Sequence, residues 1–157
     1  MTRYEKRFRS DGSEPPPLPY EFISLVENAI QDAQSHMGEV EFPSMCPDIC
    51  VANFYSSILG QLNLHQDCDE SSDSLKRGLP VVSISIGSSM KFVYGHSEDE
   101  NELDDVLLET GDVLIFGGKS RHIFYGVKEL NSYSYHRQEL HESKLRSGRL
   151  NLTLRQI

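Results

Sequence analysis

The sequence predicts a mainly β fold: a two-sheet jelly roll, also called a double-stranded β-helix, with one or two N-terminal helices. Two observations lead to this prediction. One helical stretch lies near the N-terminus, and from Ile49 onward the chain is a succession of short runs rich in β-branched and aromatic residues. Glycines separate these runs, as expected of turns between strands. One helix followed by many short strands is typical of a jelly roll.

The first residues predict an extended segment and then one domain. Residues 1–19 are charged and then proline-rich, ending Pro15-Pro16-Pro17-Leu18-Pro19, which predicts a disordered lead-in. Residues 20–157 suit a single domain, because the whole length of 157 residues is close to a common domain size of ~100–150. A helix is expected at the start of this domain, because apolar residues recur there at helical spacing: Phe22, Leu25, Val26, Ala29, Ile30 and Ala33.

Strands are predicted along the rest of the chain wherever β-branched and aromatic residues gather. The expected strands are Val81–Ile86, Lys91–Tyr94, Val106–Leu108, Val113–Phe116, Ile123–Val127 and Arg149–Arg155, after a first one that begins near Ile49.

The last strand alternates polar residues and leucines without interruption from Arg149 to Arg155. Successive side chains of a strand point to opposite faces, so one face is apolar and the other carries Arg149, Asn151, Thr153 and Arg155. A guanidinium group matches a carboxylate in bidentate geometry, so this face suits a small dicarboxylate. An amphipathic strand with its polar side in water is the alternative.

A second group of polar residues lies in the stretch from His65 to Asp69. His65, Asp67 and Asp69 are spaced by two and share one face of an extended chain. A histidine and a carboxylate are two ligands of the facial triad that binds non-haem iron(II). A solvated acidic turn running through Asp69 and Glu70 is the alternative interpretation.

Together these motifs resemble the AlkB family of iron(II)- and 2-oxoglutarate-dependent dioxygenases. The resemblance covers about two thirds of the chain in the family's order, through residues 47–55, 62–69, 80–87, 107–121 and 149–156. It implies a jelly roll that uses Fe(II), O2 and 2-oxoglutarate as co-substrate. The implied activity is oxidative demethylation of N-alkylated bases, with alkylated DNA or RNA as partner.

The resemblance also implies a role for individual residues. His65 and Asp67 match the first two iron ligands, and Asp69 matches a position that contacts the substrate base. The co-substrate residues of the family match Asn53, Tyr55, Arg149, Asn151 and Arg155, and one of these arginines would pair with the distal carboxylate of 2-oxoglutarate.

One position departs from the family's pattern. The third iron ligand is a histidine directly before a glycine, and here that position holds Tyr125, followed by Gly126. A phenol has an ordinary pKa of about 10 and must lose its proton to bind a metal well, so Tyr125 is a doubtful third ligand. His122 lies at an odd offset and is expected on the opposite strand face. The remaining histidines, His96, His136 and His141, are expected in solvated loops.

The negative net charge of the chain is unfavourable for binding a nucleic-acid substrate. The formal net charge is −9, and acidic residues cluster at 67–73 and 98–105, whereas phosphate contacts come from basic residues. Lys119, Arg121, Lys144 and Arg146 could form a small positive rim, but ordinary solubilising charge is the simpler interpretation. The nucleotide lid of the family is expected to be short or missing. Two other hypotheses therefore stay open: a catalytically impaired module that binds 2-oxoglutarate or metal, and an oxygenase acting on a different substrate class.

The sequence also predicts where the chain resides. No apolar run approaches the ~20 residues that a membrane-spanning helix needs. The odd number of cysteines, three, suits a reducing compartment. An intracellular location, cytoplasmic or nuclear, is expected, without contact to a membrane, and the sequence carries no signal for an oligomeric state.

Overall fold

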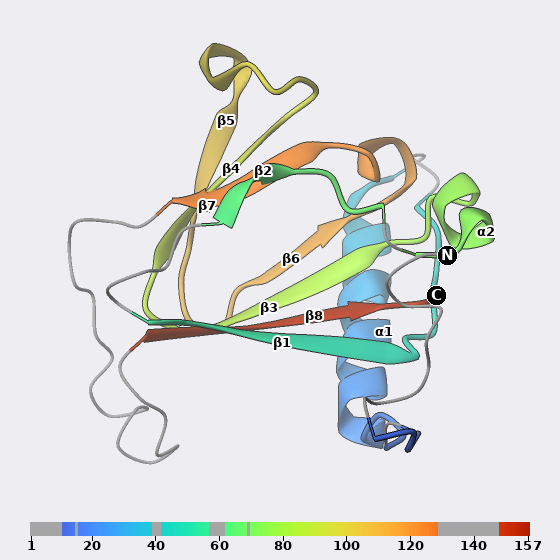
Figure 1. Ribbon diagram of the computed structural model, residues 1–157. Coiled ribbons are helices and arrows are strands. Elements are labelled where there is room, and N and C mark those ends of the chain that lie inside the picture. The colour runs from blue at the N-terminus through green and yellow to red at the C-terminus, as the bar shows by residue number, and fades with distance from the viewer. Residues whose placement is uncertain (1–10, 15, 39–41, 57–61, 69, 129–147) are drawn as a thin grey trace.

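The chain folds into two facing antiparallel sheets of four strands each (Figure 1). The computed structural model describes residues 11–14, 16–38, 42–56, 62–68, 70–128 and 148–157. One sheet has the strand order β1-β8-β3-β6 and the other β2-β7-β4-β5. The predicted jelly roll is confirmed by this architecture.

The strands lie close to their predicted positions. Their bounds are β1 Ile49–Ser56, β2 Leu62–His65, β3 Val81–Gly87, β4 Met90–Gly95, β5 Asp104–Leu108, β6 Val113–Phe116, β7 Phe124–Lys128 and β8 Gly148–Arg155. The helices are α1 Tyr20–His36 and α2 Ser72–Lys76, with 3-10 turns η1 Glu100–Glu102 and η2 Gly118–Ser120. No described helix is long and apolar enough to cross a membrane.

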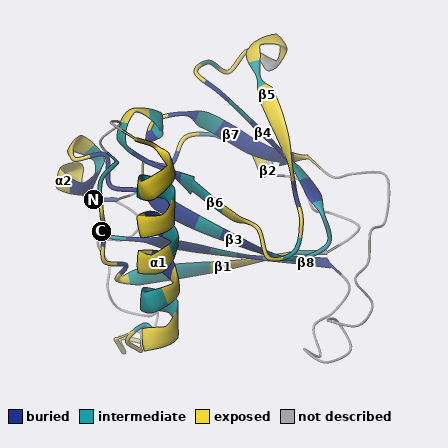
Figure 2. Ribbon diagram, turned by 180° about the vertical axis from the view of Figure 1, so that it is seen from behind, coloured by how far each residue is buried: buried dark blue, intermediate teal, exposed yellow. Residues whose placement is uncertain are grey.

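The helix α1 covers the outer face of the first sheet, seen from behind in Figure 2. Val26 and Ile30 are buried and share an apolar cluster with Leu154 of β8, so part of the leucine face of the last strand packs under the helix. Leu25 was expected on the buried helix face, and this prediction is wrong, because its side chain is 45% exposed. The contact stripe follows Val26 and Ile30 at i and i+4, and Leu25 lies about 100° around the axis from Val26.

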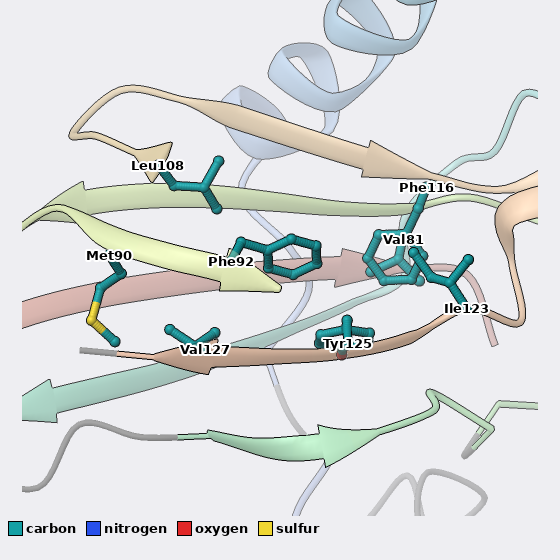
Figure 3. Packing of buried hydrophobic residues seen from close by; sticks show 8 residues of the cluster. All are labelled: Val81, Met90, Phe92, Leu108, Phe116, Ile123, Tyr125 and Val127. Atoms are coloured by element: carbon teal, nitrogen blue, oxygen red, sulfur yellow. The ribbon is translucent and has the colours of Figure 1, made fainter. Parts of the chain in front are cut away.

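A second apolar cluster lies between the two sheets (Figure 3). It consists of Val81, Met90, Phe92, Leu108, Phe116, Ile123, Tyr125 and Val127. The ring of Tyr125 stacks on Phe92 with centroids 5.4 Å apart and packs against Phe116 at 5.2 Å. These contacts fix the direction in which the Tyr125 hydroxyl points.

The segment after β2 turns into the short helix α2, which sequence patterns did not predict. Ser71 caps this helix by accepting a hydrogen bond from the backbone N–H of Ser74. Glu70, directly before the cap, is only 2% exposed. The interpretation of a solvated acidic turn is therefore wrong for Glu70, and its burial demands compensating charge. Asp69 lies outside the described residues.

Candidate active site

A polar patch extends over three neighbouring strands of the first sheet. In the antiparallel pairing of β1 and β8, Asn53 lies opposite Asn151 and Tyr55 lies opposite Arg149. On the other side of β8, Ser85 of β3 also pairs with Asn151. The two segments that the family resemblance joined, near residue 53 and near residue 151, are thus direct neighbours in the sheet.

This patch faces the second sheet and lines a cavity of about 280 Å³. The cavity is close to the lower end of the ~300–1,000 Å³ typical of ligand pockets, which suits a small molecule. Its walls hold every predicted site residue that the structure describes: Asn53, Tyr55, His65, Asp67, Tyr125, Arg149, Asn151 and Arg155. Apolar walls come from Val81, Phe92, Phe116 and Val127. The predicted polar strand face therefore lies inside the fold and not in water.

Four buried charged side chains form one end of the site. We call Asp67, Glu70, Arg121 and Arg155 the ion-pair cluster; each is at most 6% exposed. The Nη2 of Arg155 donates to Asp67 Oδ2 at 2.5 Å, and its Nη1 donates to Glu70 Oε1 at 3.2 Å. Arg155 therefore bridges two carboxylates, and the two positive and two negative charges of the cluster balance.

Arg121, which lies between η2 and β7, completes this cluster. Its Nη2 lies 2.6 Å from Glu70 Oε1, and its Nη1 donates to the backbone carbonyl of Asp67 at 2.8 Å. Solubilising charge or a rim position was expected for Arg121; that prediction is wrong, because the side chain is 2% exposed. Nothing in the local pattern marks Arg121 or Glu70 as buried, since their burial depends on pairing across 51 residues of sequence.

Arg149, at the other end of the β8 polar face, has far fewer partners. Its Nη2 donates to Ser85 Oγ at 2.8 Å. Its Nε and Nη1 are buried and have no hydrogen-bond partner among the described residues. Burial lowers the pKa of this guanidinium, while the nearby Tyr55 and Asp112 act in the opposite direction. A buried cation with unused donors favours an anionic ligand.

Polar groups beside Arg149 are already oriented by one another. Asn151 donates to Ser83 Oγ at 2.7 Å and accepts from Thr153 Oγ1 at 2.8 Å. The Tyr55 hydroxyl is half-buried, and burial raises its pKa, an effect that the charge of Arg149 partly offsets. Tyr55 is therefore a neutral hydrogen-bond donor at neutral pH, as a carboxylate ligand would require.

Tyr125 reaches the ion-pair cluster from β7. Its hydroxyl donates to Asp67 Oδ2 at 2.7 Å, the same oxygen that Arg155 contacts. Burial, and then the negative charge of Asp67 and the hydrogen bond to it, raise the pKa of Tyr125 well above its ordinary value. The phenol therefore keeps its proton and donates a hydrogen bond to Asp67.

His65 is placed with one ring nitrogen toward the site. Its Nδ1 lies 2.8 Å from the carbonyl oxygen of Asn63, so Nδ1 donates a hydrogen bond to it, and in the neutral ring Nε2 is the acceptor nitrogen. That Nε2 lies 3.9 Å from Asp67 Oδ1, a separation that two ligands of one metal ion can adopt. The ring of His65 also packs on Tyr125, with centroids 4.5 Å apart.

These positions allow a test of the iron site that the resemblance implies. His65 and Asp67 can supply two ligands, but the third position holds the protonated Tyr125. Within the described part of the chain, no group of three His, Cys, Asp or Glu side chains could hold a metal ion. The donor set therefore does not fit the three-ligand site, whereas the Arg149 region does fit a carboxylate.

None of the other described histidines supplies the missing third ligand. His122 is exposed, and its carbonyl oxygen accepts from Gln66 Nε2 at 2.6 Å. His96 is exposed just after β4, as expected of a loop histidine. His136 and His141, and the predicted rim residues Lys144 and Arg146, lie outside the described residues.

Comparison with known proteins identifies the family. Residues 1–155 match the family model described as the 2OG-Fe(II) oxygenase superfamily. This chain belongs to that superfamily. The AlkB resemblance is confirmed as well, because the chain is 34% identical over 117 residues to the alpha-ketoglutarate-dependent dioxygenase AlkB of Escherichia coli (strain K12), covering 74% of this chain and 49% of that protein.

Two relatives from Arabidopsis thaliana match nearly the whole of this oxygenase chain. They are the DNA N(6)-methyladenine demethylases ALKBH1C, 48% identical, and ALKBH1D, 51% identical, each over 99% of this chain and 36% of their own length. The solved structure of OsALKBH1 superimposes with a TM-score of 0.86 at 46% identity, covering 96% of this chain and 70% of that one. The chain thus spans about a third of the length of the two demethylases.

Proposed function

We propose that this chain carries the core of a 2-oxoglutarate-dependent oxidative dealkylase acting on N-alkylated bases in DNA or RNA. The observation that supports it most is Arg149, a buried guanidinium with unused donors in a small cavity. Its neighbours Asn53 and Tyr55 lie on the adjacent strand. The names of the relatives, demethylases of DNA and an AlkB dioxygenase, support the substrate class.

The residues would divide the work as follows. Arg149 binds the distal carboxylate of 2-oxoglutarate, and Tyr55 and Asn53 donate hydrogen bonds beside it. Asn151 is held by its hydrogen bond to Ser83. Arg155 orients Asp67, and His65 and Asp67 face the end where oxidation takes place. Asp69 would contact the substrate base. Iron(II) supplies oxygen activation in this family, and the described donor set, with Tyr125 at the third position, does not fit the three-ligand iron site.

Succinate formation tests this proposal. The protein is incubated in air with iron(II), ascorbate, 2-oxoglutarate and an oligonucleotide that contains N-methylated bases, alongside Tyr125→His and His65→Ala. Succinate and formaldehyde that form with the native protein and vanish in His65→Ala would support the dealkylase. Absence of both products from the native protein and from Tyr125→His would refute it.

One observation favours a second candidate, a catalytically impaired module that binds 2-oxoglutarate. Tyr125 stands at the position of one of the three family ligands, and its hydrogen bond engages an oxygen of another, Asp67. Turnover that appears only in Tyr125→His would support this candidate. An oxygenase for a non-nucleic-acid substrate is the third possibility, and the net charge of −9 favours it over a phosphate-rich partner.

The place of action follows from the substrate class. We propose a location in the nucleus or the cytoplasm, because DNA and RNA, the proposed substrate class, are present there. Fluorescence microscopy of the tagged protein tests it, and a location at a membrane would contradict it.

A further inference from the structure

We infer that this site binds a small carboxylate at Arg149 without the help of a metal ion. The inference rests on the proposed function, since it concerns the same pocket. It differs in that binding depends on Arg149 and not on a metal ion. In an iron-dependent site the co-substrate is held partly through the metal. Here the contacts of the described residues assign binding to the protein alone.

The first step of the argument is the state of Asp67. One oxygen of its carboxylate accepts hydrogen bonds from both Tyr125 and Arg155, and the backbone carbonyl of Asp67 accepts from Arg121. With Arg155 and Arg121 opposite Asp67 and Glu70, the ion-pair cluster is already neutral. A divalent cation would add two charges to a balanced, buried group, which is costly in a medium of low polarity.

The second step is the contrast with Arg149. It is 2% exposed, and its only hydrogen bond among the described residues is the one to a neutral hydroxyl, Ser85 Oγ. The nearby carboxylate of Asp112 influences its pKa but accepts no hydrogen bond from it. An anion that accepts from Nε and Nη1 would satisfy both unused donors in the bidentate geometry that guanidinium groups favour. The charges that line the pocket therefore favour binding of one anion and disfavour binding of a cation.

The third step concerns the ligand's chemistry. A 2-oxo acid binds a metal through its carboxylate and its keto oxygen together, so the keto group contributes most to binding where a metal is held. If Arg149 is the anchor, glutarate, which lacks the keto oxygen, should bind about as well as 2-oxoglutarate. The ligand class is then any dicarboxylate of this size, which suits a cavity of about 280 Å³.

Calorimetric titration of the EDTA-treated protein tests the inference. We expect 2-oxoglutarate and glutarate to bind with dissociation constants within about threefold of each other, and added Mn²⁺ to change either constant less than about twofold; both limits are well under 1 kcal/mol. Arg149→Met should weaken binding at least about tenfold, because two charge-assisted hydrogen bonds are lost. The matched control is Arg77→Met, since Arg77 is an exposed arginine paired only with Asp73 in the described contacts.

The opposite results would overturn it. Binding of 2-oxoglutarate that needs Mn²⁺, or that glutarate does not reproduce, would show that a metal holds the ligand. Full affinity in Arg149→Met would show that Arg149 does not hold the ligand. Absence of binding under all conditions would refute the inference altogether. Tyr125→His should restore metal dependence, with Mn²⁺ tightening 2-oxoglutarate at least about tenfold. Succinate formation is measured separately, so a protein that binds without turnover contradicts the dealkylase and leaves this inference standing.

Discussion

Arg149 and Arg155 lie on the same face of the same strand, yet they have opposite environments. Arg155 contacts Asp67 and Glu70, whereas Arg149 makes a single hydrogen bond, to a serine, and keeps two buried nitrogens without a partner in the described structure. Residue type and strand face are identical, so neither of them assigns a role. The partners of each side chain do assign a role. Arg155 belongs to the charge-balanced ion-pair cluster, whereas Arg149 is suited to bind a ligand.

The largest change in stability is expected from a substitution in the ion-pair cluster around Arg155. Glu70→Gln should lower the free energy of unfolding by about 3–5 kcal/mol, because Arg121 and Arg155 would lose a buried countercharge. Urea denaturation measures this change. Asp73→Asn is the control, since it removes an exposed ion pair with Arg77 and should cost less than about 1 kcal/mol. Equal effects of the two substitutions would mean that the cluster contributes no more than surface charge.

An effect of opposite sign is expected at the other end of β8. Arg149→Met should raise the free energy of unfolding by about 1 kcal/mol, because an apolar side chain replaces a buried guanidinium whose donors are mostly unused. The same denaturation experiment without ligand checks it. A clear loss of stability would show that the fold itself depends on Arg149, and the contrast between the two arginines would then fail.

The smallest effect concerns pH near Arg149. Burial raises the pKa of Tyr55, so the folded protein retains this proton at a pH where the unfolded chain, with a pKa of about 10, releases it. The unfolded state then binds fewer protons, and stability falls as pH rises above about 10. Thermal unfolding between pH 9 and 11, about one unit on either side of that pKa, should show a shallower decline for Tyr55→Phe than for the native protein. Parallel declines would contradict the assignment.

Much of the fold follows from local pattern, and the site follows only in part. The strands from β3 to β8 match runs of β-branched and aromatic residues, and the helix α1 follows apolar spacing. The grouping of residues near positions 53, 65 and 149 around one cavity agrees with the family resemblance, although their roles stay predictions. Sequence could not reveal the burial of Glu70 and Arg121. Each looks like surface charge until the partner from a distant segment is known.

Tyr125 illustrates a different limit. Its departure from the family's histidine is visible in the sequence, and a doubtful metal ligand was predicted there. What a phenol does at this position depends on where the carboxylate of Asp67 points, and only the structure places the two groups 2.7 Å apart. A substitution that looked like a defective ligand is, in the folded protein, a hydrogen-bond donor.

The position of β8 in its sheet has a consequence for how fast this protein folds. Ile49 pairs with Arg155, and Gly87 with Arg149, so the central strand joins segments that lie far apart in the chain. Proteins dominated by such non-local pairings fold slowly, in roughly milliseconds to seconds, because long loops must close before contacts form. Both arginines therefore reach their places only when this strand inserts between β1 and β3. A stopped-flow refolding experiment should find ligand binding recovered in the slowest phase and not before.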